Sequence, residues 1–253
     1  MSARHNDTYL GIDRKERGTS IFRFTTWDHV LELIALQRNT LVSPRQWDDP
    51  FENILNRMKF RKANGQVFCH PLRDRVYGQC WTLTEETDAA WRMYVPHGNG
   101  VRLKTTIGKL HRSLEHSQNN SGHGYASISC FIGRVQYKTQ DELEGWFLDP
   151  TWVKEHLWGV GSQGQAESLL FKREAFEPEH EIRLIYLDPH NSGTEDFFSY
   201  AIDPSNLIEQ ITFDPRMKDG LYEKNVSSLR SLSYGGTIDK SDLYQIPNIE
   251  HPI

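Results

Sequence analysis

The sequence lacks any apolar run near the roughly 20 residues that a membrane-spanning helix needs. Residues 1–20 are polar and charged and contain no hydrophobic segment, so they do not have the pattern of a secretory signal peptide. We interpret residues 1–20 as a flexible leader. These absences predict a protein that has no membrane partner.

Cysteine is scarce as well. The three cysteines, Cys69, Cys80 and Cys130, are odd in number and show no Cys-x-x-Cys spacing. This usage favours a reducing, cytoplasmic setting over a disulfide framework.

Metal-binding motifs are missing too. The sequence has no His-Glu-x-x-His and no paired ligand spacing. We therefore interpret the available histidines and cysteine as structural or solvated and predict no metal site from them: His70, His111, His116, His123 and Cys69.

Charge of one sign does not dominate, because the formal net charge is -5 with acids and bases interspersed. The overall field therefore predicts neither a nucleic-acid nor a membrane partner. One local cluster is basic and comprises Arg57, Lys59, Arg61 and Lys62. A solvated face is the favoured interpretation, and a phosphate or nucleic-acid contact is the alternative.

One glycine motif, "GVGSQG" at residues 159–164, matches the Gly-x-Gly-x-x-Gly pattern of dinucleotide-binding proteins. That pattern binds a dinucleotide only when the glycines lie between a strand and a helix. The preceding "TWVKEHLW" has a helical pattern instead. We therefore predict a loop here and no Rossmann site.

The remaining sequence alternates between short strand and helix patterns. Residues 21–26, 76–84, 127–137 and 177–187 are typical of strands, whereas residues 26–39, 85–95 and 166–176 are typical of helices. The order shows no regular alternation of strand and helix. We predict an α+β fold with a mainly antiparallel two-sheet core and flanking helices. We expect one domain over residues 21–240 and a tail over residues 241–253.

The stretch "EPEHEIRLIYL" at residues 177–187 sets acids in front of a strand-like run. Period two places Glu179, Glu181, Arg183 and Ile185 on one face, with the two carboxylates roughly 7 Å apart. Taken alone, this pattern favours an edge strand whose acids are solvated or paired with Arg183.

A second acidic stretch, "DDPFEN", contains Asp48, Asp49 and Glu52. The favoured interpretation is a structural corner, in which Asp side chains bond the turn backbone and Phe51 enters the core. The alternative is a two-carboxylate metal site, which together with Glu181 would form a nuclease centre.

Three fragments together resemble a large prokaryotic domain-of-unknown-function family. They are "QWDDPFEN" with its (Asn/Asp)-Asp-Pro-Phe-(Asp/Glu) motif, "WRMY" with Trp-x-x-Tyr, and "SLLFKREAFEPEHEIRLIYL" with a lysine followed by Glu-x-Glu-x-Arg. The resemblance covers about residues 21 to 215. The chain departs from the family where Trp47-Asp48 replaces the usual Phe-Asn.

The order of motifs also resembles, more remotely, the layout of ADP-ribosyltransferases. "FRFTT", "TLT" and Glu-x-Glu occur in the sequence in that order. The resemblance implies an ADP-ribosyltransferase-like fold with NAD as substrate. It implies that Glu181 is catalytic and Glu179 its partner. It assigns NAD-binding roles to Arg23, Thr25, Trp81, Thr82, Thr84 and Tyr94.

These observations predict an enzyme that transfers ADP-ribose from NAD or hydrolyses NAD, as a bacterial toxin or in phage defence. The acceptor is left open and includes protein and nucleic acid. Two alternatives are kept: a metal-dependent nuclease that uses Asp48, Asp49 and Glu181, and a non-enzymatic binding module.

Overall fold

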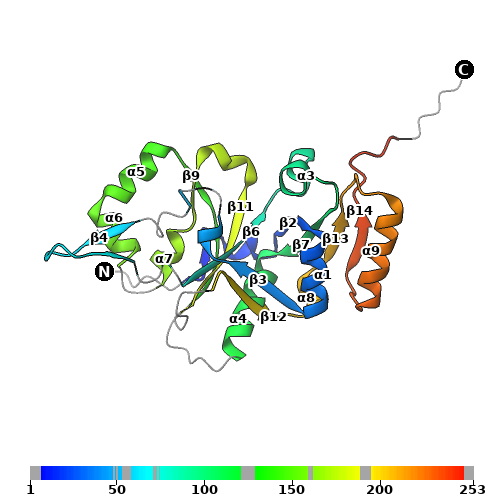
Figure 1. The fold of residues 1–253 in the computed structure, drawn as a ribbon, viewed down its shortest axis with the longest axis horizontal. Coiled ribbons are helices and arrows are strands. Elements are labelled where there is room, and N and C mark those ends of the chain that lie inside the picture. The colour runs from blue at the N-terminus through cyan, green and yellow to red at the C-terminus, as the bar shows by residue number, and fades with distance from the viewer. Residues whose placement is uncertain are drawn as a thin grey trace, which may run out of the picture. The chain divides into compact units, whose positions relative to one another are not determined.

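We describe the protein from a computed structural model (Figure 1). The structure describes residues 7–47, 49, 51–52, 58–70, 73, 75–120, 129–158, 162–188 and 195–247. Asp48, Arg57, His123 and residues 159–161 of the glycine motif lie outside these residues. None of the helices that the structure describes is long and apolar enough to span a membrane. The chain forms two compact units, which we describe separately.

The first unit comprises residues 1–21, 39–83 and 106–202. Its strands are β1 (Tyr9–Leu10), β3 (Arg38–Val42), β4 (Lys59–Arg61), β5 (Val67–Cys69), β6 (Val76–Thr82), β8 (Cys130–Arg134), β9 (Gln136–Lys138), β10 (Phe171–Arg173), β11 (Glu181–Leu187) and β12 (Phe197–Ala201). Its helices are α4 (Ile107–Asn120), α5 (Gln140–Leu148), α6 (Pro150–His156) and α7 (Gln163–Glu167), with 3-10 turns η1 (Arg14–Gly18), η2 (Pro44–Gln46) and η4 (Glu174–Glu179).

The sheet of the first unit has the strand order β1-β8-β11-β6, with β3 paired to β6 and β12 paired to β3. Strand β11 is central, because it pairs antiparallel with both β6 and β8. All seven of its residues are buried. The interpretation of this stretch as an edge strand with solvated acids is therefore wrong, whereas the pairing with Arg183 that it allowed is present for Glu181.

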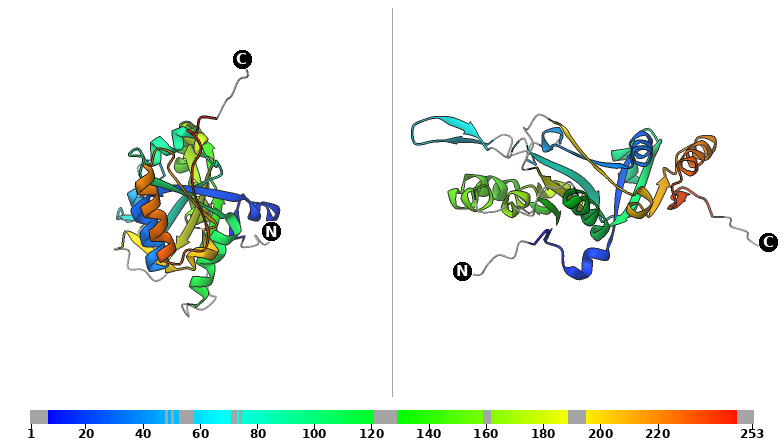
Figure 2. Two further views of the ribbon diagram at one scale, coloured as in Figure 1. Left: turned by 90° about the vertical axis from the view of Figure 1, so that its right-hand side faces the viewer. Right: turned by 90° about the horizontal axis from the view of Figure 1, so that it is seen from below.

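The second unit comprises residues 22–38, 84–105 and 203–253. It contains most of β2 (Ser20–Thr26), α1 (Trp27–Leu36), α3 (Asp88–Tyr94), β7 (Gly100–Thr106), α8 (Pro204–Leu207), β13 (Gln210–Phe213), α9 (Asp219–Ser231) and β14 (Thr237–Lys240). Its strands follow the order β2-β7-β13-β14. Phe213 of β13 contacts Trp27 of α1 and Tyr222 of α9, with ring centroids 5.5 and 5.3 Å away. Figure 2 shows α1 and α9 side by side.

The sheets are mixed, which corrects the prediction of a mainly antiparallel core. Strand β13 pairs antiparallel with β7 but parallel with β14. Strands β1 and β8 are parallel, as are β9 and β10. The reason is clear at β14, since α9 carries the chain back along β13 and lets the next strand start at the same end.

Residues 9–18 differ from the predicted flexible leader. Tyr9 and Leu10 form β1 beside β8, and both are buried together with Ile12. Helix α1, in contrast, matches the expected pattern, because its stripe of Val30, Leu33 and Ile34 is buried.

The predicted helix over residues 166–176 is largely absent. Helix α7 ends at Glu167, and Phe171–Arg173 form β10, which pairs with β9. Pairing with a neighbouring strand here outweighs the local helical pattern. This change of structure directs Lys172 toward β11.

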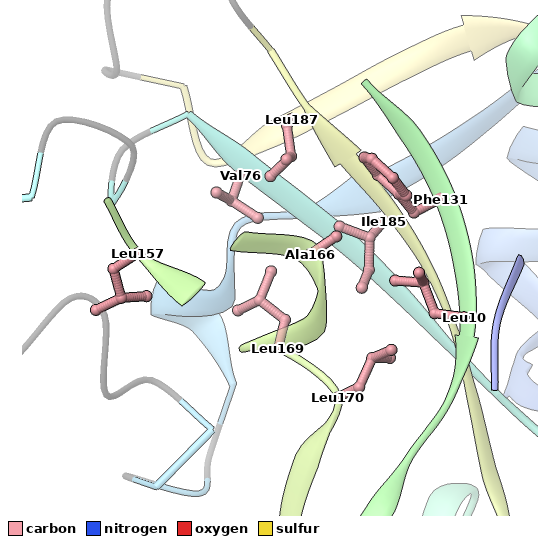
Figure 3. Packing of buried hydrophobic residues seen from close by; sticks show 9 residues of the cluster. All are labelled: Leu10, Val76, Phe131, Leu157, Ala166, Leu169, Leu170, Ile185 and Leu187. Atoms are coloured by element: carbon pink, nitrogen blue, oxygen red, sulfur yellow. The ribbon is translucent and has the colours of Figure 1, made fainter. Parts of the chain in front are cut away.

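An apolar cluster packs against the face of β11 that carries Arg183 (Figure 3). It brings together residues of β1, β6, β8, α7 and β11 with the segments that follow α6 and α7: Leu10, Val76, Phe131, Leu157, Ala166, Leu169, Leu170, Ile185 and Leu187. Since Ile185 is two residues from Arg183, its side chain shares a face with that arginine. The cluster therefore excludes water beside the charged residues at the start of β11.

Candidate functional site

The turn before β11 sets the positions of both predicted catalytic glutamates. Turn η4 ends at Glu179, and His180 adopts a left-handed conformation with φ of 44° before the strand starts at Glu181. Glu179 therefore precedes the strand and does not follow its period-two pattern. Even so, Glu179 and Glu181 both reach the ammonium group of Lys172.

Lys172 is the centre of a buried charged cluster. Its Nζ atom lies 2.8 Å from Glu52 Oε1, 2.7 Å from Glu179 Oε2 and 3.3 Å from Glu181 Oε2. An ammonium group has three N–H donors, so these three carboxylates satisfy it completely.

Arg183 is the second cation of the cluster and is fully buried. Its Nε and Nη2 atoms donate to the two carboxylate oxygens of Glu181 at 2.8 and 2.9 Å. Nη2 also lies 2.9 Å from Glu52 Oε2, and Nη1 donates to the backbone carbonyl of Leu169. The guanidinium carbon lies 4.5 Å from the centre of the Trp47 ring. The bidentate hydrogen bonds from Nε and Nη2 fix the orientation of the Glu181 carboxylate.

The pKa values in the cluster follow from its charges. Burial alone would raise the pKa of Glu181, but the charge and hydrogen bonds of Arg183, followed by Lys172, lower it to about 2. Burial raises the pKa of Glu52, and Arg183 and Lys172 offset this only in part. Three carboxylates share two cations here, so one negative charge is in excess. We infer that Glu181 stays ionised at neutral pH.

The predicted corner supplies Glu52. Asp49 Oδ1 accepts the backbone N–H of Phe51, as expected for an Asp turn. The same carboxylate pairs with Arg173, whose Nη2 atom is 3.0 Å from Oδ1. Arg173 also lies over the rings of Phe51 and Phe176. These contacts fix the turn so that Glu52 points at Lys172 and Arg183.

The same contacts bear on the nuclease alternative. Over the residues that the structure describes, no three His, Cys, Asp or Glu side chains gather in an arrangement that could hold a metal ion. Glu52 and Glu181 both pair with Lys172 and Arg183, and Asp49 is paired with Arg173. Their oxygen atoms are therefore already bound by cations of the protein.

Strand β6 places two further predicted residues beside the glutamates. Thr82 pairs with Glu181 across the strands, and its hydroxyl donates to the backbone carbonyl of Glu179 at 2.7 Å. Trp81 is 3% exposed, and its indole N–H donates to Gln79 Oε1 at 2.8 Å. Stacking of nicotinamide on Trp81 stays a prediction, and it would require the ring to be uncovered.

The other predicted NAD-binding residues belong to the second unit. Arg23 is half-buried in β2, and Thr25 Oγ1 lies 3.2 Å from His29 Nδ1. Thr84 is half-buried, and Tyr94 is 42% exposed with its ring stacked on Phe24. That these residues share a cleft with Glu181 stays a prediction.

Sequence reasoning did not assign Lys172, Glu52 and Trp47 to one site. A signal was present, because all three lie in the fragments that resemble the domain-of-unknown-function family. The structure shows that two of those fragments meet at β11: the corner provides Trp47 and Glu52, and the last fragment provides Lys172, Glu179, Glu181 and Arg183.

Comparison with known proteins gives solved structures alone. No family model matches this chain, and no curated protein does. The structures include Thermus sp. 2.9 DarT in complex with NAD+, with 12% identity, a TM-score of 0.39 and coverage of 88% of this chain and 96% of that chain. They also include the same protein in complex with ADP-ribosylated ssDNA, with 10% identity, a TM-score of 0.40 and coverage of 91% and 96%.

Proposed function

We propose that this protein cleaves NAD and transfers its ADP-ribose to an acceptor or to water. One observation supports the proposal above the others. Thr82, from the second predicted NAD-binding segment, lies directly across from Glu181 and bonds the backbone of Glu179, from the third. The two segments are far apart in the sequence, and the fold brings them to one end of β6 and β11.

The chemistry assigns a role to each carboxylate. In the proposed reaction the bond between the ribose C1′ atom and the nicotinamide nitrogen breaks, and nicotinamide leaves with the electron pair. The ribose then carries positive charge, which a fixed carboxylate stabilises. Glu181 is ionised and rigidly held, so it supplies this charge. An oxygen of the acceptor attacks C1′ and releases its proton.

Glu179 is the more accessible partner. Its side chain is 17% exposed, compared with 4% for Glu181. We assign to Glu179 the contact with the acceptor and the uptake of its proton. Arg23, Thr25, Thr84, Trp81 and Tyr94 would bind NAD in this proposal. A role as a toxin or in phage defence, in a bacterial cytoplasm, belongs to the same proposal.

Nicotinamide release from labelled NAD tests the proposal directly. We expect release by the wild-type chain and a loss of at least about 100-fold in Glu179→Gln, which is the scale of a general base. Glu177→Gln is the matched control, because Glu177 is exposed in the same turn. No release by the wild type, or equal release by Glu179→Gln and Glu177→Gln, would show that the mechanism is wrong.

A second candidate is a non-enzymatic binding module. The observation that favours it is the pairing of every charge in the cluster, with Arg183 and Glu181 buried. Such a cluster would serve only to join the corner to β11. In that case Glu181→Gln lowers stability, and no NAD-dependent activity is found in any variant.

A further inference from the structure

A basic hairpin extends from the first unit. Strands β4 and β5 pair antiparallel, with Lys59 opposite Cys69 and Arg61 opposite Val67. The turn closes through Asn64-Gly65, where Gly65 has φ of 85°. Figures 1 and 2 show the tip of the hairpin extending beyond α5 and α6. It forms a two-stranded sheet of its own.

Three cations of the hairpin pair with no acidic side chain among the residues that the structure describes. Lys59, Arg61 and Lys62 are all exposed. No ion pair joins any of them to a carboxylate within the described part of the chain, and residues 58–70 contain no Asp or Glu. Alternation along β4 puts Lys59 and Arg61 on one face, roughly 7 Å apart. The patch is thus locally basic in a chain whose net charge is -5.

Aromatic rings hold this patch in place and expose one face. Phe60 and Phe68 face each other across the strands with centroids 5.8 Å apart. Trp158 packs against both, at 5.2 and 5.9 Å, and remains 43% exposed. Lys62 Nζ lies 5.4 Å from the centre of the Phe68 ring. Cations and an accessible ring therefore occur together at the hairpin.

We propose that this hairpin binds single-stranded nucleic acid. Unpaired cations attract the phosphates of any nucleic acid, but an exposed ring gains a stacking partner only where bases are unpaired. The combination of Lys59, Arg61 and Lys62 with Trp158 thus fits a single strand better than a duplex. Binding needs no NAD, so its failure would leave the proposed function unaffected, and the reverse holds as well.

Fluorescence anisotropy with the full chain and a labelled DNA strand of about 20 nucleotides tests this proposal. We expect binding at low salt that weakens about tenfold or more in the triple variant Lys59→Gln, Arg61→Gln, Lys62→Gln. The slope of log affinity against log salt concentration falls by about 2, from about 0.7 for each lost contact. Trp158→Ala weakens binding about fivefold or more.

The matched control replaces three other exposed cations, Arg14, Lys15 and Lys224, by Gln and changes the net charge equally. We expect this control to bind like the wild type. Circular dichroism confirms that each variant is folded. Equal affinity of the wild type and the hairpin variant overturns the proposal, as does an equal loss in the control.

Two further ligands distinguish the nature of the partner. A duplex of the same sequence is expected to bind more weakly than the single strand. Tighter binding of the duplex overturns the single-strand assignment. Binding to vesicles of phosphatidylserine and phosphatidylcholine, with none to the DNA strand, overturns it in favour of an anionic membrane surface.

Discussion

Arg183 in the central strand β11 lies 2.9 Å from Glu52 in the corner that follows η2, measured from Nη2 to Oε2. Both side chains are buried, Glu52 also pairs with Lys172, and Arg183 also pairs with Glu181. This ion pair therefore links two distant segments of the chain inside the first unit. Its energetic contribution depends on both charges being present, since a lone buried charge is costly.

The first prediction concerns Glu52. We expect Glu52→Gln to lower the free energy of unfolding by about 1–3 kcal/mol, because one accepting oxygen becomes an NH2 group and leaves a buried N–H of Lys172 or Arg183 without its acceptor. Urea denaturation measures the change. Glu223→Gln removes an exposed acid of α9 and is expected to change stability by less than about 0.5 kcal/mol. Equal stability of the two variants would mean that the contacts of Glu52 with Lys172 and Arg183 do not stabilise the fold.

The second prediction concerns pH. The pKa of Glu181 is lowered from 4.5 to about 2, so its ionised form stabilises the fold above the unfolded-state value. That contribution is present above about pH 5 and disappears as pH falls toward 2. A pKa lowered by this much corresponds to a stabilising contribution of about 3 kcal/mol from the ionised Glu181 side chain.

Urea denaturation of the wild type and Glu181→Gln at several pH values checks this sign. The wild type is expected to lose its advantage over the variant between about pH 5 and pH 2. The pKa of Glu52 is raised by burial, so the titration of Glu52 runs in the opposite direction in the wild type. A stability difference that stays constant over this pH range would show that the ionised form of Glu181 does not stabilise the fold.

Some of this arrangement was predictable from the sequence. The period of two in residues 181–185 correctly placed Glu181 and Arg183 together, and the Asp-Pro-Phe corner correctly predicted that Asp49 bonds its own turn. Both are local patterns, which depend on nearby residues alone.

The remaining features depend on contacts between distant segments. Glu179 does not follow the period of the strand, because His180 adopts a left-handed conformation between Glu179 and β11. Lys172 lies in a strand rather than the predicted helix, because β10 pairs with β9. Neither β9 nor Glu52 is near Lys172 in the sequence, so no local period could predict that β9 pairs with the strand of Lys172 or that Glu52 reaches its ammonium group.

The third prediction uses two glycines. A Cβ atom at Gly78 would lie 2.6 Å from the Trp47 ring, which also covers Arg183. We expect Gly78→Ala to displace the ring and lower the free energy of unfolding by about 1–3 kcal/mol. Gly145→Ala in α5 is the control, because nothing lies within 4 Å of its added carbon. It is expected to stabilise the helix by about 0.5–1 kcal/mol. Equal signs for the two changes in stability would contradict the packing argument.

The fourth prediction concerns the amide beneath Trp81. Gln79 is buried, accepts the indole N–H of Trp81 at 2.8 Å, and exchanges hydrogen bonds with Asn39 at 2.8 and 3.2 Å. Gln79→Leu leaves these polar groups buried without their partner, and each such group costs about 1–3 kcal/mol. We therefore expect a loss of about 3 kcal/mol or more in urea denaturation. Gln245→Leu, at an exposed position, is expected to stay within about 0.5 kcal/mol of the wild type. If Gln79→Leu were as stable as this control, water would have to reach the indole N–H of Trp81. The ring would then be accessible enough for the proposed stacking on nicotinamide.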